Sequence, residues 1–275
     1  MWTLTGFADE IGNDFGEQLS VLSELGIRHL ELRSAWGVNV LNLSVEQRAT
    51  AKQLLDDAGI SVSSIGSPIG KINIAGDFAA HLRRMGHAAH VAHQFGAPYI
   101  RLFSFFIDAG DDPDRHRDEV IARMTALASV AEKNELIALH ENEKDIFGDI
   151  PRRCVDITES VGSPNLRLIM DPANFVQCGV DPFGEAYPMM REHLAYLHIK
   201  DARFDTGEVV PAGEGDGRVR ELIRALCVDG FDGFFSIEPH LGSFDAFGGF
   251  CGPQSWKRAH RAFVALLEDE GIAFQ

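Results

Sequence analysis

Hydrophobic runs of strand length alternate with longer amphipathic segments along the whole chain. Eight of these runs are rich in β-branched or aromatic residues, which predicts strands at 4–8, 28–34, 61–67, 99–106, 136–141, 166–171, 194–200 and 234–239. Amphipathic segments predict helices at 14–26, 44–59, 77–96, 112–134, 218–230 and 255–271. Several of these segments end in a glycine, as helices often do: Gly26, Gly59, Gly96 and Gly230.

The repeated strand–helix unit predicts the fold class. Eight such units in 275 residues match a single (β/α)8 TIM barrel of the α/β class. A doubly wound open sheet is the alternative, and it is weaker because no glycine fingerprint follows the first strand. No linker or composition break interrupts the chain, so residues 1–275 are predicted to form one domain. Residues 241–254, rich in Gly and Phe, are predicted to be a long loop after the eighth strand.

Each of the last four predicted strands ends in a polar residue. These residues are Glu141, Asp171, His198 and Glu238. Period-two alternation places each on a face that could point into the barrel. Alone, each has an ordinary explanation, such as a solvated strand end, a turn or a half-buried histidine. Together, on four consecutive strands whose C-terminal ends build the active site of such barrels, they predict one common site.

The residue types at these four positions predict a metal site. Three carboxylates and one imidazole form a hard-to-borderline donor set that suits a divalent cation. One ion is expected, with Mn²⁺ preferred and Mg²⁺, Co²⁺ or Zn²⁺ also compatible.

Motifs around these residues resemble a known family. The segments "LHEN", "MDPANF", "LHIKDA", "PAGEGDG" and "GFDGFFSIEPH" resemble the sugar isomerase/epimerase superfamily, whose fold is the xylose-isomerase-like TIM barrel of AP endonuclease family 2 type. The resemblance covers essentially the whole chain. It implies that Glu141, Asp171, His198 and Glu238 are metal ligands and that Glu141 and Glu238 are also the catalytic acid/base pair.

The chain departs from many members of this superfamily at one position. They carry a histidine three residues after the metal-binding aspartate, where this chain has Asn174. An asparagine can hydrogen-bond a substrate hydroxyl but cannot become a cation. The identity of the substrate therefore does not carry over from those relatives.

The expected activity is a divalent-metal-dependent isomerase or epimerase of a keto-sugar or cyclitol, working by proton transfer through a metal-bound enediolate. A lyase of the same fold, such as an inosose-type dehydratase, is the alternative. A metal-dependent endonuclease is disfavoured because the third and fourth predicted strands end without histidine. A non-catalytic sugar-binding or metal-sensing protein is a further alternative.

Four residues are predicted to bind substrate: Asn174, Lys200, Glu31 and His240. Lys200 and His240 each lie two residues after a candidate ligand and could share its face. Glu31 ends the second strand, where it could line the barrel mouth or pair with Arg33.

Other polar residues near the strand ends receive structural roles. Arg101 is expected in a structural ion pair, Glu143 in a loop, and His140 facing away from the metal. The glycine-rich segment 211–217 has two acidic residues and no basic residue, so a closing turn is favoured over a phosphate site.

Net charge and cysteine content limit the binding partners and the cellular location that we expect for the protein. A formal net charge of −16 disfavours nucleic acid and anionic membranes, which leaves a small-molecule sugar or cyclitol as the expected partner. The four cysteines are spread out, and neither a signal peptide nor an apolar membrane span is recognisable, so a cytoplasmic location is expected. Segment 241–254 could support a homo-oligomer or cover the site.

Overall fold

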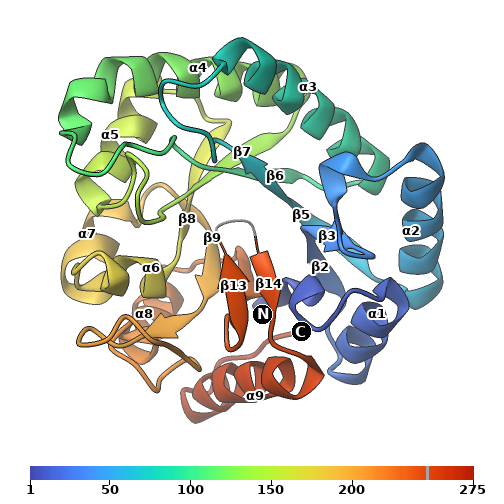
Figure 1. Cartoon of the computed structure of the whole chain (residues 1–275). Helices are drawn as coiled ribbons and strands as arrows, with labels where there is room; N and C mark the ends of the chain where they lie inside the picture. The colour runs from blue at the N-terminus through green and yellow to red at the C-terminus, as the bar shows by residue number, and fades with distance from the viewer. Residues whose placement is uncertain (246–247) are drawn as a thin grey trace.

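The computed structural model describes residues 1–245 and 248–275 and shows a nearly closed barrel of eight parallel strands inside a ring of helices (Figure 1). The strands pair in the order β1-β12-β9-β8-β7-β6-β5-β2. They are β1 (Thr3–Gly6), β2 (His29–Leu32), β5 (Ser61–Ile69), β6 (Tyr99–Leu102), β7 (Ile137–Glu141), β8 (Leu166–Met170), β9 (Leu194–Ile199) and β12 (Phe234–Ile237). Each matches one predicted strand, so the TIM-barrel prediction is confirmed.

Helices follow the barrel strands and cover the outside of the sheet. The larger ones are α1 (Phe15–Glu24), α2 (Val45–Ala58), α3 (Phe78–Phe95), α4 (Arg117–Lys133), α5 (Pro151–Val161), α8 (Val219–Val228) and α9 (Pro253–Asp269). Shorter ones are η1 (Ala8–Glu10), η2 (Val40–Asn42), η3 (Pro113–His116), α6 (Pro172–Gln177), η4 (Pro182–Ala186) and α7 (Tyr187–Met190). The hydrophobic pattern does not single out α5, α6 or α7. Two of these are only 6 and 4 residues long, too short to show a helical period. Within the described residues, no helix is long and apolar enough to span a bilayer.

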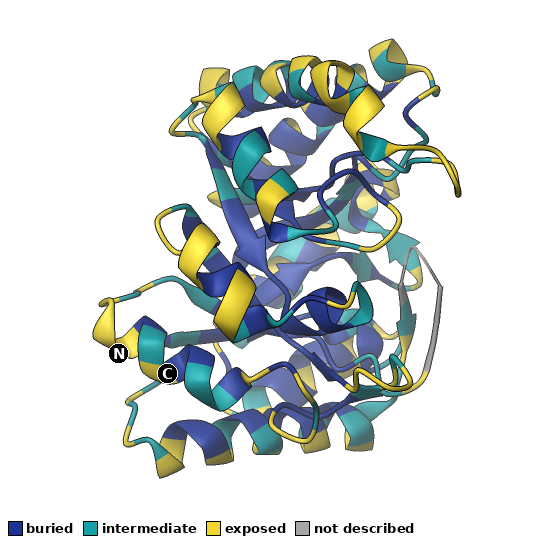
Figure 2. Ribbon diagram, turned by 90° about the vertical axis from the view of Figure 1, so that its left-hand side faces the viewer, coloured by how far each residue is buried: buried dark blue, intermediate teal, exposed yellow. Residues whose placement is uncertain are grey.

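Three short antiparallel pairs extend from the strand ends. They are β3 (Ser34–Ala35) with β4 (Val38–Asn39), β10 (Asp201–Ala202) with β11 (Val209–Val210), and β13 (Ser243–Asp245) with β14 (Gly248–Phe250). The last pair corrects the prediction of an unstructured loop over 241–254, although residues 246–247 lie outside the described part. In Figure 2 the two marked chain ends lie on one side of the molecule, and buried residues, drawn in dark blue, fill the strands at its centre.

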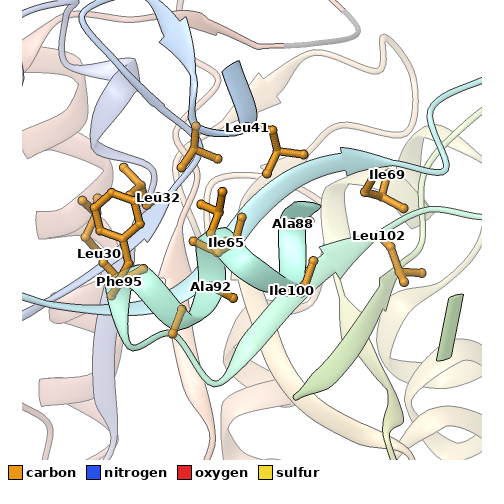
Figure 3. Close-up of a cluster of buried hydrophobic side chains, with 14 of the residues drawn as sticks. Leu30, Leu32, Leu41, Ile65, Ile69, Ala88, Ala92, Phe95, Ile100 and Leu102 are labelled. Carbon is orange, nitrogen blue, oxygen red and sulfur yellow. The ribbon is translucent and has the colours of Figure 1, made fainter. Parts of the chain in front are cut away.

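Apolar side chains fill two separate kinds of space. Outside the sheet, Ala88, Ala92 and Phe95 of α3 pack against Ile65 and Ile100 of the strands (Figure 3). Each fully buried side chain of Leu, Ile or Phe size contributes about 1.5–3 kcal/mol. This packing holds the strands in place and so fixes where their C-terminal ends point.

The interior of the barrel has its own small cluster of Leu139, Ile169 and Tyr196. These residues lie two positions before Glu141, Asp171 and His198 on their strands. Residues on the face predicted to point inward thus gather in one buried cluster on three of these strands.

Strand β1 uses its two edges differently. The Phe7 N–H donates to Ile237 of β12, whereas the N–H groups of Trp2 and Leu4 donate to the carbonyls of Ala273 and Gln275 at 2.9 and 2.8 Å. Successive strand residues alternate their hydrogen-bonding direction, so residues 273–275 lie on the β1 edge that faces away from β12.

Candidate metal centre

Four side chains in or directly after β7, β8, β9 and β12 meet at the C-terminal end of the barrel. One donor atom from each of Glu141, Asp171, His198 and Glu238 lies within 4.8 Å of the others, and all four residues are buried. In register, Glu141 pairs with Ile169, and Ser236 pairs with His198. This stagger along tilted strands brings the four side chains to one level.

The imidazole of His198 faces all three carboxylates with one nitrogen. Its Nδ1 lies 3.0 Å from Oε1 of Glu141, 3.4 Å from Oε2 of Glu238 and 4.0 Å from Oδ2 of Asp171. Three oxygens and one nitrogen are thus directed toward a common point, as a divalent cation requires.

The second oxygen of each carboxylate is bound by a group outside the cluster. Arg101 Nη1 lies 3.2 Å from Oε2 of Glu141, and Arg33 Nη1 lies 3.4 Å from Oε1 of Glu238. The backbone N–H of Asn174 donates to Oδ1 of Asp171 at 2.9 Å, which caps α6. Each carboxylate therefore turns one oxygen inward, and the donor set fits a divalent cation.

Charge crowding shifts the pKa values of these groups. Burial raises the pKa of Asp171 to about 6, with Glu238 and Glu141 adding to the increase and Lys200 opposing it. Burial lowers the pKa of His198, but the charges of Glu141 and Glu31 outweigh burial and raise it well above its usual value. The cluster therefore favours positive charge at its centre.

Burial raises the pKa values of Glu141 and Glu238, but nearby positive charges outweigh this effect. Despite burial, the charges of His198 and Arg101 bring the pKa of Glu141 down to about 2. Lys200 and His240 lower the pKa of Glu238 well below its usual value, against the effect of burial. Both carboxyls are thus ionised at neutral pH.

Lys200 and Asn174 stand between this cluster and a cavity of about 850 Å³, which both of them line. Lys200 Nζ lies 2.8 Å from Oδ2 of Asp171 and 3.1 Å from Oε2 of Glu238. The Asn174 amide lies 3.4 Å from Oε1 of Glu141. These two side chains therefore connect the cavity with the buried cluster.

His240 and Glu143 also line the cavity. His240 Nδ1 lies 3.2 Å from Oε1 of Glu10 and 3.6 Å from Oε1 of Glu238. Glu143 lies in the segment after β7, as expected, and pairs with Lys71 at 3.3 Å. The strand-end pattern does not reveal Lys71, because it follows Gly70 beyond the end of β5.

Glu31 lies beside His198, on the opposite side of the ring from the three carboxylates. Its Oε2 is 3.2 Å from Nε2 of His198, and the residue is 1% exposed. The described lining of the cavity does not include Glu31.

Arg33 binds acidic groups near the start of the chain, and no ion pair joins it to Glu31 within the described part of the structure. It pairs with Asp9 at 2.8 Å, Glu10 at 3.2 Å and Glu238 at 3.4 Å. Donor atoms of Glu10, Glu238 and His240 also lie within 4.8 Å of one another. The Arg33 guanidinium already supplies positive charge to that second group.

Two further sequence predictions concern Arg101 and His140. Arg101 forms the expected ion pair, but its partner is the candidate ligand Glu141. His140 is fully buried outside the cluster, where its ring lies against the backbone at Gly148.

The glycine-rich segment 211–217 wraps around the side chain of Asp201. Oδ2 of Asp201 accepts from the N–H groups of Gly213 and Gly215 at 2.9 and 3.1 Å. Oδ1 accepts from Gly217 and Ala202 at 2.7 and 2.8 Å. A Cβ at Gly215 would lie 2.5 Å from Oδ1 of Asp201, so a glycine is required there. The amides that could hold a phosphate thus bind the chain's own carboxylate, which supports the predicted closing turn.

The family described as xylose isomerase-like TIM barrel matches residues 19–266. The chain belongs to this family. Membership agrees with the barrel, with the buried cluster at its C-terminal end and with the resemblance seen in the sequence motifs.

Two curated relatives cover part of the chain. One, 28% identical over 176 residues, is a 2-epi-5-epi-valiolone 7-phosphate 2-epimerase of Actinoplanes sp.; the match covers 64% of this chain and 63% of the relative. The other, 22% identical over 181 residues, is a 3-dehydroshikimate dehydratase of Bacillus anthracis, with coverage of 65% and 63%. The chain thus matches less than two thirds of the length of either relative.

Solved structures match nearly the whole chain at the level of the fold. A D-tagatose 3-epimerase-like protein superposes with a TM-score of 0.80 at 15% identity, covering 98% of this chain and 100% of the other. A xylose isomerase-like TIM barrel protein from Mycobacterium smegmatis in complex with magnesium gives a TM-score of 0.71 at 21% identity, covering 97% of each chain.

Proposed function

We propose that the protein is a divalent-metal-dependent isomerase or epimerase of a keto-sugar or cyclitol. The observation that carries this proposal is the convergence of four buried donor atoms next to Lys200 and Asn174, which line a cavity. The Actinoplanes relative, an epimerase of a valiolone phosphate, supports a substrate of this class.

Glu141, Asp171, His198 and Glu238 would hold the cation, with Mn²⁺ the expected ion and Mg²⁺, Co²⁺ or Zn²⁺ compatible with the same donors. When bound, such an ion acts as a Lewis acid that acidifies the C–H next to a carbonyl. The magnesium complex of the Mycobacterium smegmatis protein supports a hard divalent ion in this fold.

The chain's own residues would move the proton. Glu141 ends β7 and Glu238 directly follows β12; these two strands are separated in the sheet by β8 and β9. One glutamate takes the proton from the carbon next to the carbonyl, and the other returns it from the other side, which inverts that carbon. Return of the proton to the neighbouring carbon instead gives aldose–ketose isomerisation.

Three cavity-lining residues would orient the substrate: Asn174, Lys200 and His240. The ammonium of Lys200 can donate hydrogen bonds to a carbonyl or hydroxyl oxygen, and the amide of Asn174 can bind a hydroxyl. Their position next to the carboxylates places the reacting carbon near the proton-transferring groups.

A dehydratase of the same fold is the second candidate. The Bacillus anthracis relative, a 3-dehydroshikimate dehydratase, favours it. The same proton removal would then be followed by loss of a β-hydroxyl group as water instead of return of the proton.

The proposal is tested by metal analysis of the purified protein and by NMR in D₂O with D-tagatose, a ketocyclitol and 3-dehydroshikimate as probes. Deuterium exchange at the carbon next to the carbonyl without loss of water identifies an isomerase or epimerase, whereas loss of water identifies a dehydratase. Glu141→Gln is expected to lower exchange at least about 100-fold, on the usual scale of a general base.

The exposed Glu159 on α5 offers a matched control, because Glu159→Gln makes the same chemical change far from the cluster. Unchanged exchange in Glu141→Gln removes Glu141 from the mechanism. A protein that binds no divalent metal and exchanges none of these probes refutes the proposal.

A further inference from the structure

We propose that Glu31 is a positioning residue, which fixes the imidazole of His198 for metal binding instead of contacting substrate. This inference rests on the proposed metal centre. Glu31 is 1% exposed, and the described lining of the cavity does not include it. Its carboxylate contacts Nε2 of His198, so the imidazole ring lies between Glu31 and the three carboxylates that face Nδ1.

The contact between Glu31 and His198 determines which ring nitrogen is free. Oε2 of Glu31 lies 3.2 Å from Nε2, while Nδ1 faces the three carboxylates. A neutral imidazole carries one proton, and a nitrogen that binds a metal must offer its lone pair. With Glu31 accepting the proton of Nε2, Nδ1 is left as the ligand atom.

Packing fixes the plane of the same ring. Phe7 meets the His198 ring edge-on at a centroid distance of 5.2 Å, and Tyr196 does so at 6.0 Å. His198 is itself fully buried. Rotation of the ring is thus restricted by its aromatic neighbours, and its protonated nitrogen is defined by Glu31.

A buried carboxylate at this place is costly unless it has a function. Among the described residues, Oε1 of Glu31 has no hydrogen-bond partner. Burial and the charge of Glu31 raise the pKa of the nearby Tyr196 hydroxyl, which also hydrogen-bonds Ser63 at 2.9 Å. The contact with Nε2 of His198 at 3.2 Å is the one that links this buried carboxylate to the candidate metal centre.

The first test measures Mn²⁺ affinity by titration calorimetry, which requires no substrate. Glu31→Leu keeps the volume but removes the acceptor, and it is expected to weaken Mn²⁺ binding about 10–100-fold, the usual effect of losing such an outer partner. Glu31→Gln retains a carbonyl oxygen that can accept from Nε2, and it is expected to recover most of the affinity.

Asp149 provides a control for the loss of one partly buried negative charge that does not border the cluster. It pairs with Arg153 of α5 at 2.7 Å. Asp149→Asn is therefore expected to change Mn²⁺ affinity less than about threefold, since none of its described contacts involves a candidate ligand.

A second test needs no Glu31 variant and determines directly which nitrogen of His198 carries the proton. In zinc-loaded protein labelled with ¹⁵N-histidine, we expect His198 to carry its proton on Nε2, with the signal assigned by its loss in His198→Gln. A proton on Nδ1 overturns the inference.

Equal Mn²⁺ affinity in wild type and Glu31→Leu overturns the role of Glu31 but leaves the metal centre standing. Absence of Mn²⁺ binding by the wild type refutes the proposed function and this inference together.

Discussion

Two buried arginines sit behind the two glutamates that we propose move protons. Arg101 pairs with Glu141, and Arg33 pairs with Glu238; both guanidinium groups lie over the ring of Phe7, at 4.8 and 4.4 Å from its centroid. Arg33 also binds two other acids, whereas Glu141 is the acidic partner that the structure gives Arg101. Glu141 thus depends on Arg101 more than Glu238 depends on Arg33.

Replacement of Arg101 tests this dependence. Arg101→Gln is expected to lower kcat for the exchange reaction at least about tenfold with a smaller effect on KM, because a displaced Glu141 acts in proton transfer more than in binding. Arg101→Lys keeps the charge and is expected to retain more activity.

Arg123 supplies the control for loss of a buried arginine. It pairs with Glu119 and lies over the rings of Phe78 and Phe105, away from the cluster. If Arg123→Gln and Arg101→Gln lower kcat equally, the effect is structural and Arg101 has no special role.

The lowered pKa of His81 predicts that the free energy of unfolding decreases in acid. The Gly70 N–H donates to its Nε2 at 2.6 Å, and burial together with the charges of Arg84 and Arg123 lowers its pKa to about 4. The unfolded chain takes up a proton near pH 6.5, before the folded chain does, so stability falls as pH drops from 6.5 toward 4. The loss between pH 7 and pH 5 is about 2 kcal/mol.

Urea unfolding at pH 7 and pH 5 measures this loss. His81→Gln keeps a side-chain acceptor for Gly70 but does not titrate in this range, so its stability is expected to change less between the two pH values. An equal change in both proteins would contradict the assignment to His81.

Among the elements, the glycine-rich segment 211–217 depends on a single side chain. Asp201 accepts four backbone hydrogen bonds, three of them from this segment. Asp201→Ala leaves these donors without their acceptor and is expected to lower the free energy of unfolding by about 3 kcal/mol. Because Pro211 and Glu214 line the cavity, the variant should also raise KM.

Asp181 serves as the comparison, because it accepts two backbone N–H groups at the start of η4. Asp181→Ala is expected to cost about 1 kcal/mol, the usual cost of a lost cap. Urea unfolding of both variants measures the difference, and equal losses would show that Asp201 is an ordinary cap.

The sequence predicts elements well where a period is long enough to be seen. All eight barrel strands follow from their apolar runs, and the four strand-end residues expected at one site, Glu141, Asp171, His198 and Glu238, lie close together. The contacts of Arg33 with Asp9 and Glu10 join residues 24 and 23 positions apart, so no local pattern reveals them. The contact of Glu31 with His198 spans 167 positions and depends on closure of the barrel.

At the scale of the whole molecule, the candidate metal centre and the joined chain ends lie at opposite ends of the barrel. Residues 273–275 make three backbone hydrogen bonds with Trp2 and Leu4. Deletion of residues 273–275 is expected to lower the free energy of unfolding by about 3 kcal/mol through loss of these bonds. Mn²⁺ affinity is expected to stay unchanged, because the centre is at the other end.

Gln275→Ala is the matched control, since it keeps the backbone bonds and removes only a side-chain contact with Thr3 at 3.4 Å. Urea unfolding and calorimetry of the two variants provide the measurement. A deletion that weakens Mn²⁺ binding as strongly as it weakens folding would show that the two ends are coupled.

Residues 273–275, which lie along β1, also affect the tendency of the protein to aggregate. Exposed N–H and C=O groups on a strand edge invite another polypeptide to add as a further strand, the usual start of aggregation. At Trp2 and Leu4 these groups are already occupied by the molecule's own last residues. Residues 273–275 therefore cover this part of the β1 edge. Without them, the barrel could remain folded but would expose backbone groups that can pair with another chain.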